Sequence, residues 1–161
     1  MVNEDLKLSD ILTREAFENS IKVNAAIGGS TNFVIHLLAI AGRIGVSLDI
    51  NDFDVLSANI PLIANLQPSG KFFMEDFYYA GGLPVVMKEM IDHLHETCKT
   101  VTGKTVIENI SKAEIWDRNV IATTGEPFNL QSGIVVLKGN LCKNGAIMKP
   151  SAASTHLMHH T

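Results

Sequence analysis

The segment Gly28-Gly29-Ser30-Thr31-Asn32 has the residue types of an anion-binding helix start. Glycines allow a backbone to approach a ligand closely, and the first turn of a helix presents free N–H groups and the positive end of the helix dipole. A carboxylate or a phosphate would bind at such a point. Ser30, Thr31 and Asn32 are therefore our candidate substrate-binding residues. The alternative is a glycine break followed by an ordinary helix cap, because the segment lacks the lysine of a phosphate-binding P-loop.

A second segment, Pro68-Ser69-Gly70-Lys71, could present a lysine to an anion. The alternative is a turn followed by a solvated lysine, which proline and glycine at these positions favour. Glu75 and Asp76 follow on an expected helix, where adjacent residues point about 100° apart and cannot readily chelate one ion together. We expect these two carboxylates to complement the helix dipole instead.

The histidines and cysteines do not predict a metal site. The pair His93-x-His95 diverges on a helix, and His156-x-x-His159-His160 comes without a carboxylate or a cysteine. Cys98 and Cys142 alone are too few ligands for an iron–sulfur cluster. We therefore assign no metal ligand and no catalytic residue.

Short helices have to position these residues. Thr13 can cap the first helix, and one of residues 30–32 can cap the second, which Gly42 or Gly45 can end. The hydrophobic pattern and the capping residues predict further helices at 53–57, 71–80, 84–97 and 105–112. The first helix should continue to about residue 24.

β-favouring runs become frequent toward the end of the chain. The expected strands are residues 60–66, 119–122, 133–138 and 146–149. Pro61 is compatible with the first of them because it lies at the start of the strand. Asn144-Gly145 predicts a hairpin, since these residues supply the positive φ angles of a tight turn.

The change of pattern near residue 117 divides the chain into two regions. Residues 1–117 predict an α/β fold, and residues 118–161 predict the opening of a β-rich domain. A few strands alone are only marginally stable. We therefore expect the chain to be a truncated part of a longer protein.

Composition excludes several classes of protein. The chain has 161 residues, of which 46% are hydrophobic, and a net charge of −4. It has no basic block, so we expect no nucleic-acid partner. No apolar run is long enough to span a bilayer, so we expect no membrane association. The N-terminus does not resemble a secretory signal, which together with two isolated cysteines favours a cytoplasmic protein with free thiols.

A series of segments carries a family resemblance. The series includes Gly28-Gly29-Ser30-Thr31-Asn32 and Leu66-Gln67-Pro68-Ser69-Gly70-Lys71, and its other members are residues 10–19, 23–27, 36–41, 52–54, 74–76, 80–84, 101–105, 108–109, 137–141 and 145–146. In this order and spacing the chain resembles the IlvD/Edd dehydratases, which are dihydroxy-acid and sugar-acid dehydratases. Residues 77–82, 149–154 and 156–161 are similar to the aldonic-acid branch, of arabinonate or xylonate type.

The resemblance implies a lyase. A hydro-lyase of this family dehydrates a 2,3-dihydroxy acid, either an aldonic acid or a branched-chain dihydroxy acid, to a 2-keto acid. It uses an iron–sulfur cluster and magnesium, whose ligands lie outside the matched stretch, as does the catalytic serine. The family implies an α/β N-terminal domain ending at residue 117, a β-barrel-like C-terminal domain beginning at residue 118, and a full-length homo-oligomer. We therefore expect an internal fragment that is inactive alone and binds neither cofactor.

We expect a piece of a dehydratase that acts on a small hydroxy acid. Two other functions remain open. The chain could be a stand-alone anion-binding module that uses the helix start at Gly28 to Asn32. It could also be an assembly piece that completes a split enzyme.

Overall fold

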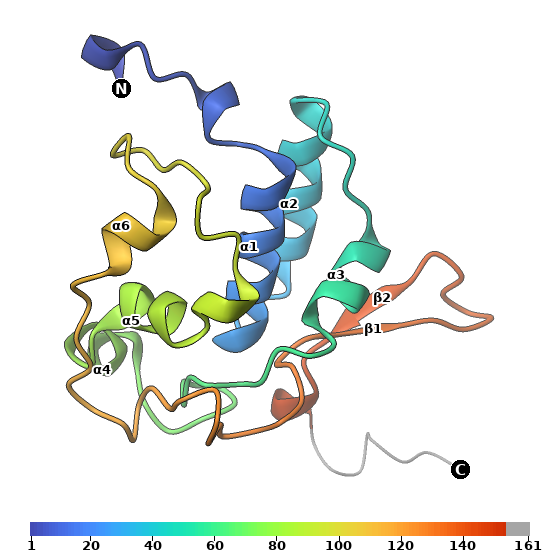
Figure 1. Cartoon of the computed structure of the whole chain (residues 1–161). Helices are drawn as coiled ribbons and strands as arrows, with labels where there is room; N and C mark the ends of the chain where they lie inside the picture. Colours follow the sequence, from blue (N-terminus) through green and yellow to red (C-terminus); the bar gives the residue numbers. More distant parts are fainter. Residues whose placement is uncertain (154–161) are drawn as a thin grey trace.

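The computed structural model describes residues 1–153, in which helices predominate (Figure 1). The α-helices are α1 (Arg14–Ala26), α2 (Asn32–Arg43), α3 (Ile50–Ser57), α4 (Met74–Tyr79), α5 (Gly82–Glu89) and α6 (Val106–Ile110). The strands are β1 (Val135–Leu137) and β2 (Ala146–Met148), and short 3-10 turns lie at Val2–Glu4, Leu8–Asp10, Ile91–His93 and Pro150–Ala152. Helix α1 lies in the middle, in contact with α2 and α3 on one side and α5 on the other.

Local capping explains where several helices begin. Thr13 caps α1 and Thr105 caps α6, each by accepting a backbone N–H hydrogen bond with its side-chain oxygen, as the sequence predicts. Helix α3 begins earlier than expected because Asp49 is its cap, whereas Asn51 and Asp52 donate their backbone N–H groups to the Asp49 carboxylate.

The helix expected over residues 84–97 is shorter than predicted. Helix α5 ends at Glu89, and the chain is extended again near His95. Farther along, the Asn19 side chain of α1 accepts a hydrogen bond from His95 N–H (2.8 Å) and donates one to His95 C=O (3.0 Å), which keeps His95 out of a helix. This tertiary contact competes with helical pairing of the same groups. Helix α4 likewise occupies only part of the expected helix at 71–80.

The apolar run at residues 60–66 is mostly buried, but the prediction that it is a sheet strand is wrong. Its backbone N–H groups donate to the carbonyl oxygens of Ala26, Val120 and Asn129, which belong to different segments of the chain. These partners satisfy the buried backbone without forming a continuous ladder. The prediction of a strand at residues 119–122 is also wrong, since that segment makes only an isolated bridge to the same run.

The C-terminal hairpin is confirmed, with shorter strands than expected. Strands β1 and β2 pair antiparallel, with Val136 opposite Ile147. Residues 138–145 connect them, so the loop is longer than the tight Asn-Gly turn that the sequence predicts. Gly145 adopts a φ of +91°, a left-handed conformation that favours glycine.

Two clusters of buried apolar side chains meet at α1. Phe17 and Ile21 face α2 and α3, whereas Val23 faces α5 and the run at residues 60–66. Residues 120–122 belong to the cluster that contains Val23. Residues 120–122, just after the expected boundary near residue 117, therefore pack in the same core as α1 and α5.

The fold class agrees with the prediction only in coarse terms. Residues 1–153 form a mostly helical structure with one two-stranded antiparallel sheet, which is mixed α/β at most. The strands expected at residues 60–66 and 119–122 do not join this sheet, because they form only isolated bridges. The division into an α/β domain and the start of a β-barrel-like domain stays a prediction.

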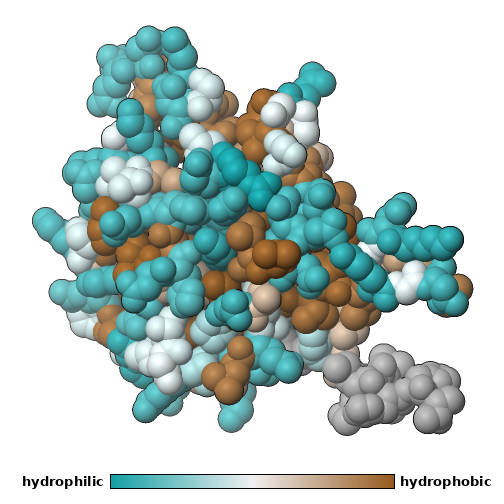
Figure 2. Space-filling model, turned by 45° about the vertical axis from the view of Figure 1, so that its right-hand side comes forward, coloured by the Kyte–Doolittle hydropathy of each residue, from teal (hydrophilic) through white to brown (hydrophobic). Residues whose placement is uncertain are grey.

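Large apolar side chains are exposed at several places. Figure 2 shows apolar areas between the polar side chains of one face. Phe73 and Met74, at the start of α4, are 62% and 65% exposed, and Tyr78 and Tyr79 at its end are exposed too. Within residues 1–153, no helix is both long enough and apolar enough to cross a membrane.

Candidate functional site

The link between α1 and α2 depends on two glycines. Gly28 has a φ of +59°, and a Cβ added there would lie 3.0 Å from the Leu62 Cδ1 atom. Gly29 donates its N–H to the Asn24 carbonyl oxygen (2.9 Å), and a Cβ at Gly29 would lie 2.0 Å from Asn24 Oδ1. Larger residues do not fit either position without a shift of the neighbours. The glycine pair therefore brings the backbone close to α1 and to the buried run.

Ser30 supplies the side-chain hydrogen bond at the start of α2. Its hydroxyl accepts a hydrogen bond from Asn32 N–H at 3.2 Å. Thr31 is the residue before the helix, and its side chain makes no capping hydrogen bond. No other group among the described residues forms a hydrogen bond with the Thr31 hydroxyl, so this hydroxyl is available to a ligand.

A cavity of about 470 Å³ lies beside this helix start. Its lining residues are Ile27, Gly28, Gly29, Ser30, Thr31, Leu66, Gln67, Pro68, Met74 and Lys149. The structure thus brings together two segments that the sequence marks separately, the glycine segment and the Pro68 turn. Of the three predicted binding residues, Ser30 and Thr31 line the cavity and Asn32 does not.

The Pro68 turn forms the second wall of the cavity. Gly70 closes this turn by donating its N–H to the Leu66 carbonyl oxygen (2.7 Å), and a Cβ at Gly70 would lie 2.4 Å from the Asn65 carbonyl carbon. Lys71 is exposed and does not line the cavity. The structure therefore agrees with a turn followed by a solvated lysine.

Lys149 comes from the C-terminal hairpin and forms the third part of the lining. It follows β2 and precedes the 3-10 turn Pro150–Ala152. Burial lowers the pKa of its ammonium group, because a charge is less favourable away from water. The sequence does not single out Lys149 as a site residue, since its distance along the chain from Gly28 gives no local signal.

An ion-pair network lies on another side of α1. The Arg14 guanidinium binds both Glu18 (2.8 Å) and Asp52 (3.1 Å), and His95 Nε2 lies 2.7 Å from Glu18 Oε2. Hydrogen bonds from Arg14 hold the pKa of Asp52 below its usual range. Burial acts to raise the pKa of Glu18, but hydrogen bonds from Arg14 and His95 outweigh this effect and lower it. The network ties α1 to α3 and to the segment after α5.

The described residues do not fit a metal or cluster site. Residues 1–153 contain no group of three or more His, Cys, Asp or Glu side chains placed to hold a metal ion. Cys98 is partly buried, which raises its pKa, and Cys142 is exposed in the hairpin loop, where its Sγ donates to the Gly145 carbonyl oxygen. The histidines at 156, 159 and 160 lie outside the described residues.

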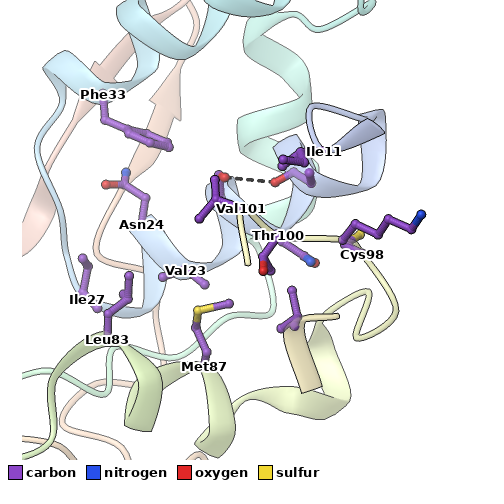
Figure 3. Close-up of a pocket in the computed structure, with 15 residues that line it drawn as sticks. Ile11, Val23, Asn24, Ile27, Phe33, Leu83, Met87, Cys98, Thr100 and Val101 are labelled. Carbon is purple, nitrogen blue, oxygen red and sulfur yellow. Dashed lines mark hydrogen bonds between the residues drawn. The ribbon is translucent and has the colours of Figure 1, made fainter. Parts of the chain in front are cut away.

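A second cavity, of about 460 Å³, lies between α1, α5 and residues 98–101 (Figure 3). Its lining is mainly apolar and includes Val23, Leu83 and Met87. Polar residues such as Asn24 and Thr100 also line it, but most of its surface is apolar. In the cavity beside Gly28 a larger share of the lining surface is polar.

Two protein families together match nearly the whole chain. A family described as "Dihydroxy-acid/6-phosphogluconate dehydratase N-terminal" matches residues 1–109. A second, described as "Dihydroxy-acid/6-phosphogluconate dehydratase C-terminal", matches residues 119–161.

Individual relatives agree with these matches. An L-arabinonate dehydratase from Rhizobium leguminosarum bv. trifolii is 52% identical over 162 residues, which are 99% of this chain and 28% of the relative. An L-arabonate dehydratase from Azospirillum brasilense is 50% identical over 163 residues, with the same coverage. A dihydroxy-acid dehydratase from Caldicellulosiruptor bescii is 44% identical over 162 residues, which are 99% of this chain and 29% of the relative. The chain thus spans less than a third of the length of these relatives.

Proposed function

Because the chain belongs to the dihydroxy-acid/6-phosphogluconate dehydratase family, we propose that it is part of a hydro-lyase acting on a 2,3-dihydroxy acid. In this reaction the C2 proton and the C3 hydroxide leave together as water, and the resulting enol tautomerises to the 2-keto acid. We propose that the residues of this chain bind the acid and that they do not carry out the dehydration. We expect the chain to be inactive alone.

The substrate class that we favour is an aldonic acid of arabinonate type. What supports this choice is the higher identity to the L-arabinonate and L-arabonate dehydratases, at 52% and 50%, than to the dihydroxy-acid dehydratase at 44%. A branched-chain dihydroxy acid is the alternative substrate.

The observation that carries the proposal is the cavity beside Gly28. The start of α2 faces it with the Ser30 and Thr31 residues, and Gln67 adds a side chain that can both donate and accept hydrogen bonds. The volume of about 470 Å³ lies in the range of small-molecule sites. In our proposal these groups bind and orient the hydroxyl and carboxylate groups of the acid, and Asn32 supports the helix start from outside the cavity.

The family's iron–sulfur cluster and magnesium have no fitting ligand set among residues 1–153. Cys98 and Cys142 occupy separate parts of the structure, and neither has a cluster of further ligands around it. We therefore derive no step through either group. The groups that transfer protons are likewise not assigned to this chain.

Three further expectations belong to this proposal. We propose a division near residue 117, which is supported by the gap between the two family matches, one ending at residue 109 and the next beginning at residue 119. We also propose that the full-length enzyme is a homo-oligomer. A cytoplasmic location is the third expectation.

A binding experiment tests the assigned site. The 161-residue chain is titrated with L-arabinonate in a calorimeter, and Thr31→Val should weaken binding about fivefold, because a neutral hydrogen bond contributes about 1 kcal/mol. Thr97→Val is the matched control, since Thr97 is exposed and does not line this cavity. Equal affinity of the wild-type chain and the Thr31 variant would contradict the assignment of Thr31.

A chimera tests the proposed reaction. This chain replaces the matched 162 residues of the Rhizobium leguminosarum L-arabinonate dehydratase. The chimera should convert L-arabinonate to a 2-keto acid, measured with a carbonyl reagent, and Thr31→Val in the chimera should lower the rate. A folded chimera without activity on L-arabinonate or on a branched-chain dihydroxy acid would refute the proposed reaction.

A further inference from the structure

The cavity beside Gly28 has one charged side chain in its lining, that of Lys149. The other lining residues are apolar, glycine, or neutral and polar. A ligand in this cavity therefore meets a single positive charge and no carboxylate. This charge pattern fits a small anion better than a neutral polyol or a cation.

The charge of Lys149 is not compensated within the described part of the chain. Among residues 1–153, Lys149 forms no salt bridge. Its ammonium group also donates no hydrogen bond to these residues. Its residue is only partly exposed. A partly buried ammonium group without a partner gains from an anion, because the anion replaces the hydration that burial removes.

The hairpin that carries Lys149 is anchored to the same structure that holds the glycine segment. Val136 of β1 and Ile147 of β2 pack against the cluster that contains α1, α2 and α3. Ahead of β1, Gly133 donates its N–H to the Ala25 carbonyl oxygen (3.3 Å) near the end of α1. The packing of Val136 and Ile147 and the hydrogen bond of Gly133 thus hold the hairpin, and with it Lys149, against the helices that flank the glycine segment.

We propose that Lys149 binds the carboxylate of the hydroxy acid, so that the glycine segment and the chain after β2 build the site jointly. This inference rests on the proposed function and adds a binding residue to it. Ser30, Thr31 and Gln67 are then left for the hydroxyl groups of the same ligand. The chemical class required by this arrangement is a small polyhydroxy monocarboxylate.

The test uses the 161-residue chain with the variants Lys149→Gln and Lys149→Arg. Lys149→Gln should weaken the binding of L-arabinonate at least about tenfold, as loss of a charge-assisted hydrogen bond does. Lys149→Arg keeps the positive charge and should retain most of the affinity. Lys143→Gln is the matched control, because Lys143 is exposed in the hairpin loop. Circular dichroism of each variant checks that the fold is retained.

Two further ligands separate the inference from the proposed function. L-arabinitol lacks the carboxylate, so its weaker binding should be the same in the wild-type chain and in Lys149→Gln. If L-arabinonate binding depends on Thr31 but not on Lys149, the inference is wrong and the proposed function stands. If the chain binds inorganic phosphate through Lys149 but does not bind L-arabinonate, then Lys149 is an anion-binding residue and the proposed substrate is wrong. If the wild-type chain binds neither anion, the inference is refuted.

Discussion

Gly133 lies against Gly28 so closely that a Cβ added to Gly133 would stand 2.5 Å from the Gly28 Cα atom. This contact joins two backbones that are far apart in the sequence. Gly28 is part of the candidate site, and Gly133 leads into the hairpin that carries Lys149. A glycine at position 133 therefore sets how closely the two parts of the site approach each other.

Gly133→Ala should lower the free energy of unfolding by about 1–3 kcal/mol, because the added methyl group meets backbone that cannot rotate away. Gly139→Ala is the matched control, since a Cβ there meets no atom within 4 Å. Urea unfolding followed by circular dichroism measures both effects. Equal stability of the two variants would show that the Gly133–Gly28 contact does not constrain the fold.

Gly42 and Gly45, near the end of α2, should respond oppositely to the same substitution. Gly42 lies within the helix and a Cβ there meets nothing, so Gly42→Ala should stabilise the chain by about 0.5–1 kcal/mol. Gly45 has a φ of +76°, so Gly45→Ala should destabilise it by about 1–2 kcal/mol although its surroundings are equally open. Thermal unfolding of the two variants gives the comparison. Changes of the same sign would contradict the conformational explanation.

The Arg14–Asp52 pair should make stability depend on pH in the acid range. The pKa of Asp52 is lowered in the folded chain, so its stabilisation is complete above the unfolded pKa, near about pH 4. It is lost as the pH falls through the lower folded pKa. Asp52→Asn should therefore cost about 1 kcal/mol or less at pH 7, because both side chains are partly exposed, and nothing at a pH below the folded pKa.

The matched control for this pair is Asp54→Asn. Asp54 is exposed and forms no salt bridge with another described residue. Asn at position 52 keeps an oxygen that can accept the hydrogen bond from Asp49 N–H, so the substitution isolates the charge. Unfolding midpoints between pH 7 and pH 3 follow the effect. A difference that grows toward acid pH would contradict the sign derived above.

Ile63 should be among the positions most sensitive to truncation. Its side chain is 0% exposed, in the cluster shared by α1, α5 and residues 120–122. Ile63→Ala should lower the free energy of unfolding by about 2–5 kcal/mol through lost burial and a residual cavity. Ile35→Ala, at a position that is 68% exposed, should change it by less than about 0.5 kcal/mol. Chemical unfolding measures both, and a small effect at Ile63 would show that the core relaxes there.

The features that the sequence determined by itself are local ones. Thr13 and Thr105 cap their helices because a side-chain oxygen reaches a backbone N–H a few residues away. The glycine segment before α2 and the existence of a C-terminal hairpin follow from equally short-range preferences. The family resemblance also rests on the order of short motifs, and the comparisons confirm it.

Tertiary structure alone decided the features that depend on distant partners. The helix expected at 84–97 does not reach its expected end, where Asn19 binds the backbone of His95. The run at 60–66 is no sheet strand because its partners belong to separate segments of the chain. The cavity combines Gly28, Pro68 and Lys149, which no spacing along the chain relates. Such contacts form only when burial of the two α1 clusters brings remote segments together, so no local pattern encodes them.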